Sequence, residues 1–233
     1  VAWCWKEASG IMDIVSFTGN GSARTVSHSL SAVPGLIITK NIELGSSEWP
    51  TYHHKNTAAP ETERLFLSGT HAMSDNSTFF NDTDPTSSVF SVGTSSDANG
   101  NTNSMISYVF ADVQGFSSAF KFTGNGNSNG PFVWCNGIGN IAFLMIKRSD
   151  STSDWHIYDN KRSDSGGGNP NDQYLEADTS NTEASGLDVD FVAGGFKIKS
   201  SSSDINASGG TYIGFAVASA PFVNSNGVPC NAR

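Results

Sequence analysis

Phe17-Thr18-Gly19-Asn20-Gly21 recurs 105 residues later as Phe122-Thr123-Gly124-Asn125-Gly126. Three more blocks recur in the same order and within one or two residues of that offset. In the first copy they are Ile37-Ile38-Thr39-Lys40, Trp49-Pro50-Thr51-Tyr52 and Val89-Phe90-Ser91-Val92; in the second they are Leu144-Met145-Ile146-Lys147, Trp155-His156-Ile157-Tyr158 and Gly195-Phe196-Lys197-Ile198. Blocks that keep one order indicate an internal repeat, which has to be recognised before any other feature of the fold.

The repeat divides the chain into four predicted parts. Residues 11–116 form the first repeat, 117–222 form the second, and 223–233 are a C-terminal tail. Residues 3–10 align with 108–115, the end of the first repeat, at the same offset. We therefore predict that residues 1–10 are the last strand of a preceding repeat, with Trp3 and Trp5 buried. A chain that begins in this way, at Val1, is expected to be a piece of a longer protein.

The apolar segments are short, rich in Val, Ile, Phe and Thr, and separated by Gly, Asn, Ser and Asp, which is typical of β-strands and turns. We expect seven strands in each repeat. They lie near 12–18, 24–30, 35–41, 48–54, 63–68, 87–93 and 103–113 in the first, and near 119–123, 131–135, 141–148, 154–159, 173–177, 194–199 and 210–218 in the second. The chain is therefore predicted to be all-β, with two tandem antiparallel β-sandwich (jelly-roll-like) repeats of about 105 residues.

Both repeats are expected to share one strand order and to bury equivalent side chains, because polar residues alternate with these side chains along each strand. The expected buried pairs are Phe17/Phe122, Ile38/Met145, Trp49/Trp155 and Phe90/Phe196.

Segments rich in Gly, Asn and Ser are predicted to be turns or loops. Thr-Gly-Asn-Gly at 18–21 and 123–126 tolerates positive φ, so the chain can reverse there. Residues 204–210, with a counterpart at 97–101, are predicted to be a hairpin connection. Residues 163–172 are predicted to be a long loop in the second copy.

Composition limits the classes of partner. The chain has 13 Lys and Arg against 22 Asp and Glu, a formal net charge of −9, which argues against nucleic acid and against an anionic membrane surface. No segment approaches the ~20 consecutive apolar residues that cross a bilayer. Three cysteines (Cys4, Cys135 and Cys230) without CxxC spacing favour free thiols, with a single disulfide as the alternative.

Two clusters of aromatic and polar residues are the candidate ligand-binding sites. They are Trp49, Tyr52, His53 and His54 in the first repeat, and Tyr158, Asp159, Lys161, Arg162 and Tyr174 in the second. A Trp or Tyr ring can stack on the apolar face of a sugar while Asp, Asn or Arg binds its hydroxyls, and we expect such contacts on loops, where the copies differ. For the tryptophans, packing in the core is the favoured interpretation, because a residue that recurs in each repeat usually serves the packing that recurs with it.

Other chemistry has little support in the sequence. Adjacent His53 and His54 would point to opposite faces of a strand, so we expect no metal site and no other cofactor, with Ca²⁺ in the Asp- and Asn-rich loops as a lesser alternative. No nucleophile elbow, P-loop or zinc-protease motif is present, and no spacing places two carboxylates across a cleft. We therefore predict that the chain is not an enzyme.

Several phrases together resemble a known family. They are the two Phe-Thr-Gly-Asn-Gly segments, Phe143-Leu144-Met145-Ile146-Lys147-Arg148 followed by 154–162, Gly194-Gly195-Phe196-Lys197-Ile198, and 204–209. The chain resembles tandem-repeat virion proteins of tailed bacteriophages, especially marine and cyanobacterial phages, which are tail fibre or tail structural proteins. The first copy departs from the pattern around 49–60, where Pro50 and the adjacent histidines interrupt the strand.

The resemblance implies a location in the virion, and other virion proteins or further copies of the chain as partners. It brings no catalytic or ligand-binding residues. The leading hypothesis is a non-enzymatic structural and adhesion module of a phage tail or tail fibre, with host surface glycan as its candidate ligand. The alternative is a carbohydrate-binding module or lectin of a secreted bacterial protein. A third hypothesis, a polysaccharide-degrading enzyme, rests only on the abundance of carboxylates.

Overall fold

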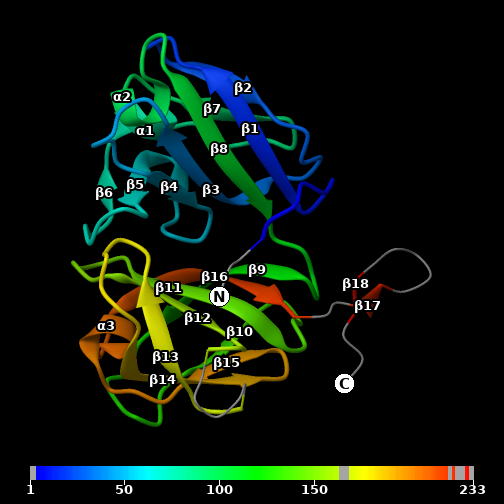
Figure 1. The fold of residues 1–233 in the computed structure, drawn as a ribbon, viewed down its shortest axis with the longest axis vertical. Helices are drawn as coiled ribbons and strands as arrows, with labels where there is room; N and C mark the ends of the chain where they lie inside the picture. Colours follow the sequence, from blue (N-terminus) through cyan, green and yellow to red (C-terminus); the bar gives the residue numbers. More distant parts are fainter. Residues whose placement is uncertain (1–3, 163–167, 220–221, 224–228, 231–233) are drawn as a thin grey trace. The chain divides into compact units, whose positions relative to one another are not determined.

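The computed structural model of the chain describes residues 4–162, 168–219, 222–223 and 229–230. The regular structure of these residues is 44% strand and 7% helix, the helices being single turns, so the chain is all-β as predicted. The chain divides into two compact units, Cys4–Asp112 and Val113–Arg233, called here the first and the second unit (Figure 1).

The first unit is built on one six-stranded antiparallel sheet and a separate pair of strands. Its elements are β1 (Met12–Thr18), β2 (Arg24–Ser27), β3 (Pro34–Asn41), β4 (Pro50–His53), η1 (Pro60–Thr62), β5 (Glu63–Phe66), β6 (Ser74–Asp75), α1 (Ser77–Phe80), β7 (Val89–Val92), α2 (Ser96–Asn99) and β8 (Ser104–Ala111). The large sheet has the order β1-β8-β3-β4-β5-β6, and β2 pairs with β7 alone.

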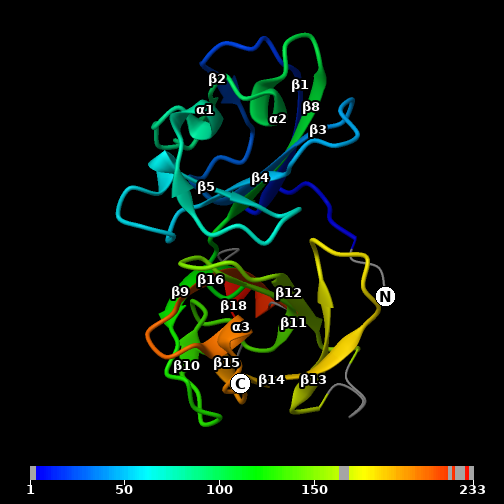
Figure 2. The same cartoon turned by 90° about the vertical axis from the view of Figure 1, so that its left-hand side faces the viewer.

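The second unit joins all of its main strands into one sheet. Its elements are β9 (Ser117–Thr123), β10 (Phe132–Trp134), β11 (Ile141–Arg148), β12 (Trp155–Asp159), β13 (Asn171–Glu176), β14 (Ala184–Val192), β15 (Gly195–Ile198), α3 (Ser203–Asn206) and β16 (Thr211–Ala218). The order is β10-β15-β14-β13-β12-β11-β16-β9, and the sheet curves into a nearly closed barrel (Figure 2). Strands β17 (Phe222–Val223) and β18 (Pro229–Cys230) pair with each other in the predicted tail, of which 224–228 and 231–233 lie outside the described residues.

The two units have corresponding strand pairs. Five strands of the first unit follow one another across the sheet in the order β1-β8-β3-β4-β5. Their equivalents in the second unit follow in the same order, β9-β16-β11-β12-β13, and the pair β2·β7 corresponds to β10·β15. The register corresponds as well, since Val26 faces Phe90 as Val133 faces Phe196. β14 is the exception: the first unit has β6 and α1 in its place, and the sequence analysis did not predict this strand.

The predicted core pairs are mostly buried. Ile38, Met145, Trp155, Phe90, Phe196 and Phe122 are at most 9% exposed. Phe17 and Trp49 are half-buried, with the Phe17 ring 6.3 Å from that of Phe90. The recurring residues therefore form the interior of both units. Two of them, Phe17 and Trp49, are less buried in the first unit than their equivalents are in the second.

The segment before β1 corrects the predicted strand at 1–10. Residues 4–7 have no regular structure and Trp5 is 39% exposed, although its ring packs edge-on against Phe110 at 5.3 Å; residues 1–3 lie outside the described residues. The sequence alignment itself holds, because Ala8 bridges to Met12 as Val113 bridges to Ser117. Residues 8–12 are therefore the turn that leads into β1, as 113–117 are the turn that leads into β9. Residues 4–7 align with the end of β8 and its following residue, but they do not form a strand themselves.

A buried asparagine clamps the recurring Phe-Thr-Gly-Asn-Gly segment in the first unit. Asn99 ends α2 and its side chain is fully buried. Its amide nitrogen donates to the carbonyl oxygens of Ser22 and Gly93, at 2.8 and 3.0 Å, and to Asn20 Oδ1 at 3.0 Å. Its own Oδ1 accepts the Asn20 N–H at 3.1 Å. One side chain thus satisfies polar groups of two segments, residues 20–22, which are distant in sequence, and Gly93.

Asn206 repeats the clamp in the second unit. It ends α3, is fully buried, and donates to the carbonyl oxygens of Asn127 and Ser200 at 2.8 Å each. It exchanges a second pair of bonds with Asn125, donating to its Oδ1 at 3.1 Å and accepting its N–H at 2.8 Å. The hairpin predicted at 204–210 is wrong, because β15 and β16, on either side of this segment, pair with other strands and not with each other. The segment instead contains most of α3, whose last residue, Asn206, is buried.

The clamp explains the first glycine of each recurring segment. A Cβ on Gly19 would lie 2.0 Å from the Gly100 carbonyl oxygen, and a Cβ on Gly124 would lie 2.3 Å from that of Ala207. The second glycines, Gly21 and Gly126, have φ of +67° and +68°. Both glycines are required by backbone contact and backbone conformation, as predicted for the turn.

Candidate functional site

The predicted cluster of the first unit lies largely inside the protein. Tyr52 and His53 belong to β4 and are only 3% and 2% exposed. The Tyr52 ring packs edge-on against Phe80 at 5.7 Å, and burial raises the pKa of its hydroxyl. These two side chains are core contacts, which corrects their assignment to a ligand-binding loop.

His53 has a positional counterpart in Asp159, and the two residues make the same turn. The Lys55 N–H donates to His53 Nδ1 at 3.2 Å, and the Lys161 N–H donates to Asp159 Oδ1 at 2.9 Å. Since Nδ1 accepts a hydrogen bond, the neutral imidazole carries its proton on Nε2. The two units therefore have the same turn after this strand, although one has His and the other has Asp at this position.

His54 lies at the surface end of the cluster and faces a carboxylate. His54 Nε2 lies 3.3 Å and Lys55 Nζ lies 3.1 Å from Asp112 Oδ2. Burial of Asp112 by itself raises the pKa of the carboxyl, but the hydrogen bond from His54 and the charge of Lys55 outweigh burial and hold the pKa below its usual value. The group ties the end of β4 to the residue that follows β8, and it is half-exposed.

Trp49 precedes β4 and is half-buried. Lys40 Nζ lies 5.5 Å from the centroid of its ring, a cation–π distance. One face of the ring is therefore close to a side chain of the same unit, which leaves less of it for stacking on a sugar.

The predicted cluster of the second unit is also mainly structural. Tyr158 is fully buried, donates to the Leu187 carbonyl at 2.9 Å, and has a hydroxyl pKa raised well above its usual value by burial. Arg162 lies 3.2 Å from the buried Asp159 and also binds Glu183. These contacts correct the assignment of Tyr158, Asp159 and Arg162 as ligand-binding residues.

Two members of the second cluster reach the surface. Lys161 is exposed and Tyr174, in β13, is half-buried. The Tyr174 ring lies 5.2 Å from that of His156 and 6.0 Å from that of Tyr158. The predicted glycan contact therefore narrows to Trp49, His54, Lys161 and Tyr174, and these residues belong to different units.

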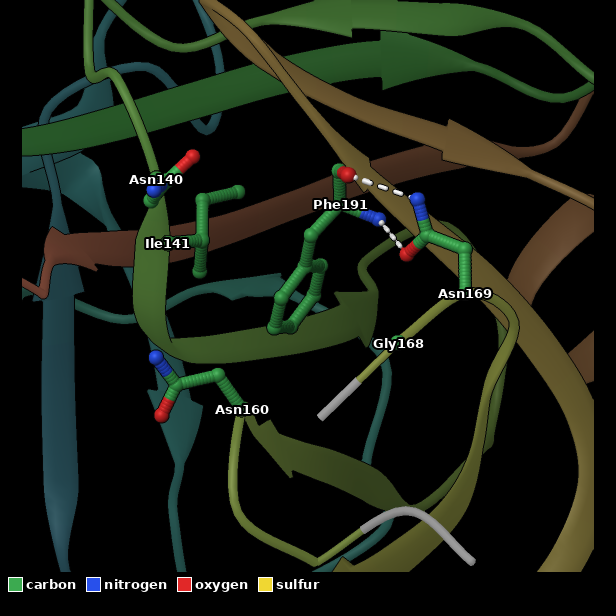
Figure 3. A pocket seen from close by; sticks show the side chains of 6 residues that line it. All are labelled: Asn140, Ile141, Asn160, Gly168, Asn169 and Phe191. Carbon is green, nitrogen blue, oxygen red and sulfur yellow. Dashed lines mark hydrogen bonds between the residues drawn. The ribbon is translucent and has the colours of Figure 1, made fainter. Parts of the chain in front are cut away.

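A small open cavity lies beside β11 and β14 of the second unit (Figure 3). It has a volume of about 200 Å³ and is lined by Asn140, Ile141, Asn160, Gly168, Asn169 and Phe191. The half-buried Phe191 belongs to β14, and Asn169 fixes its backbone through two hydrogen bonds of 2.8 Å, one to the N–H and one to the carbonyl oxygen. Amide groups and the edge of an aromatic ring thus surround the space.

The comparisons with known proteins identify a family. A family model described as a domain of unknown function (DUF7483) matches residues 1–221. The chain belongs to the DUF7483 family. No curated protein and no solved structure matches it. The family description carries no activity, so the function of this DUF7483 chain has to be argued from its own geometry.

The cavity of the DUF7483 chain was missed by sequence reasoning. Its described lining supplies amide donors and acceptors from Asn140 and Asn160 and no titratable side chain, so it can hydrogen-bond a neutral polar ligand. The available signal was the pair of asparagines that flank β11 and β12. Elsewhere, no three His, Cys, Asp or Glu of the described residues converge on a possible metal position, and no described helix is long and apolar enough to cross a membrane.

Proposed function

We propose that this DUF7483 chain is a non-enzymatic structural and adhesion module of a bacteriophage virion, part of a tail or tail fibre, with host surface glycan as its ligand. We also propose that its two units are copies of one β-sandwich unit of about 105 residues. The second copy departs from a two-sheet jelly roll, because its strands join into one sheet.

The Asn99 and Asn206 clamps are the observation that carries the proposal. Each is a fully buried amide at the end of a one-turn helix, and each makes the same four bonds to equivalent groups. A module duplicated with its interior intact serves repetition of a surface, as in proteins that present several weak contacts at once. The resemblance to phage tail proteins supports the location in a virion.

The cavity at Phe191 favours a second candidate, a carbohydrate-binding module of a secreted bacterial protein. Amides that flank an aromatic ring suit the hydroxyl and C–H groups of a sugar. In both candidates the chain binds glycan, and they differ in the particle or protein that carries it.

Immunogold electron microscopy separates the two candidates. An antibody raised against the purified chain should decorate the tail region of particles released by a host that expresses the parental gene. Gold on the tail supports the virion module. Label only in the particle-free supernatant, with bare particles, rejects it in favour of the secreted module.

A further inference from the structure

Two aromatic side chains project from one face of β10, the edge strand of the second unit. Phe132 is 50% exposed and Trp134 is 62% exposed, whereas Val133 between them is 3% exposed. Among the described residues of the second unit, these two are the exposed large hydrophobic side chains. Aromatic rings on an edge strand favour unwanted association, so their exposure calls for a specific reason.

The first unit has the same strand without the rings. Because Val26 pairs with Phe90 as Val133 pairs with Phe196, Thr25 corresponds to Phe132 and Ser27 corresponds to Trp134. Thr25 and Ser27 are exposed as well. The outward positions thus keep their exposure in both units, but only the second unit places aromatic rings on them.

The backbone beneath Trp134 is shaped to receive its ring. A Cβ on Gly194 would lie 2.4 Å from Cζ3 of Trp134, and Gly194 has φ of +85°. Gly194 is itself fixed, since its N–H donates to the Ile138 carbonyl at 2.8 Å and its carbonyl accepts the Cys135 N–H at 2.8 Å. The indole therefore rests against a glycine backbone and remains 62% open to solvent.

Charged side chains lie beside the rings on the same face. Phe132 pairs with Lys197 of β15, and Lys197 pairs with Asp190 of β14. Directly paired residues of neighbouring strands point to the same side of a sheet, so Lys197 lies next to Phe132 in one row, and Asp190 lies beyond Lys197. Lys197 Nζ donates one hydrogen bond to the Gly130 carbonyl at 2.7 Å, and its ammonium group has two further protons to donate. The face combines two apolar rings, about 7 Å apart along the strand, with a donor and an acceptor for hydrogen bonds.

We propose that Phe132 and Trp134 form a saccharide-stacking site for a polysaccharide of at least two sugar units. The polarised C–H groups on one face of a pyranose suit the negative face of an aromatic ring, and its hydroxyls suit Lys197 and Asp190. A protein partner fits less well, because a specific protein interface needs roughly 800 Å² on each side and these rings lie beside charged residues. The inference rests on the proposed adhesion function, and it names the class of ligand that the chain would bind.

The test uses the full chain and two linked measurements. The wild-type chain is first screened on an array of neutral, amino and acidic oligosaccharides, and its affinity for the strongest ligand is then measured by calorimetry. F132T/W134S, which gives β10 the residues of β2, should lose about tenfold in affinity for each ring. The matched control T25A/S27A should bind like the wild type.

An NMR titration of the unmodified chain keeps the test independent of folding defects. Saturating ligand should shift the indole N–H resonance of Trp134 more than that of Trp49. Binding that is unchanged in F132T/W134S, or a shift confined to Trp49, would overturn the site. Absence of binding across the array would also overturn it, while gold label on the tail would still support the virion module.

Discussion

The first unit leaves β2 and β7 as a separate pair, whereas the second unit joins the equivalent β10 and β15 to the rest of its sheet. The difference lies in one segment. In the second unit β14 pairs with both β13 and β15. In the first unit the chain forms α1 at this point, and Asn81 and Asp82, with φ of +55° and +44°, end the helix. The presence of β14 thus decides whether the strands join into one nearly closed barrel, as in the second unit, or leave one pair separate, as in the first.

The comparison shows which parts of such a unit can change. Each unit has a buried asparagine clamp and a buried phenylalanine at the same position, Phe90 in the first unit and Phe196 in the second. These residues belong to the shared interior. The two units differ in the outward residues of β2 and β10, where Thr25 of the first unit corresponds to Phe132 of the second. Both positions are exposed, so either residue fits without changing the packing of the interior. An interior that the two units share therefore leaves their surfaces free to make different contacts.

Removing the clamp should have the largest effect, and it should be similar in both units. N99A and N206A each leave several buried donors and acceptors unsatisfied, at a cost of at least about 3 kcal/mol of unfolding free energy. Urea denaturation followed by fluorescence and circular dichroism measures it. N101A, at an exposed residue next to the first clamp, should cost less than about 0.5 kcal/mol. A large loss in only one of the two clamp variants would break the correspondence.

The equivalent lysines of β3 and β11 should behave differently. Lys147 is fully buried and donates to the Arg148 carbonyl at 2.7 Å, whereas Lys40 is half-buried and donates to Ser47. Burial lowers the pKa of Lys147 to about 8 from 10.5. At pH 7 this lowering of the pKa costs folding about 3 kcal/mol relative to a lysine whose pKa is the same in the folded and unfolded states. K147M should therefore be more stable than the wild type. K40M should lose stability, because it loses its bonds to Ser47.

The pH dependence checks the same lysine. Between about pH 8 and 10.5 the unfolded chain binds a proton that folded Lys147 does not, so the unfolding free energy should rise with pH in that window. Denaturation between pH 7 and 9.5 should show this rise in the wild type and a flatter curve in K147M. Parallel curves for the two proteins would contradict the buried charge.

Acidification should destabilise the second unit through His156. This side chain is 2% exposed, and burial lowers its pKa below 6.5. As the pH falls below 6.5, the unfolded chain takes up a proton that the folded chain refuses, so stability falls by at most about 1.4 kcal/mol per pH unit from this group. The first unit has Pro50 at the corresponding position. H156L should flatten the acid limb of the stability curve, and an unchanged limb would rule His156 out as its cause.

The smallest expected difference is in amide exchange. β15 has strands on both sides, whereas β7 has β2 on one side only. Amides of Gly195–Ile198 should therefore exchange several-fold more slowly than those of Val89–Val92. Hydrogen exchange followed by NMR measures both segments in one sample. Equal protection would mean that β14 adds no local stability.

The sequence predicted the shared features well because both copies carry them. The Phe17/Phe122 offset located the repeat, and alternation of apolar residues located most strands. β14 was not predicted, because the strands were located from features that both copies share. Its own sequence shows the alternation of a strand, with Leu187, Val189 and Phe191 separated by Asp188 and Asp190. The first copy offers no counterpart to this strand, so the repeat does not reveal it.

The site was harder to predict than the fold. Tyr52 and Tyr158 are aromatic residues near loops, and only tertiary packing shows that both are buried. Phe132 and Trp134 were assigned to a strand, where a run of three apolar residues indicates core. Comparison with Thr25 and Ser27 could have shown that the outward positions had become aromatic. Ser-Ser-Asp-x-Asn recurs at 95–99 and 202–206, so the sequence marks the clamp residue in both units. It does not mark the partners of the clamp, because Asn206 bonds to residues about 80 positions away.

A crystal structure of the chain tests the duplicated unit most directly. It should show β1-β8-β3-β4-β5 and β9-β16-β11-β12-β13 in corresponding order, with Asn99 and Asn206 buried and each bonded to the Asn of its own Phe-Thr-Gly-Asn-Gly segment. A different strand order in the two units, or one of these asparagine side chains exposed to solvent, would contradict it.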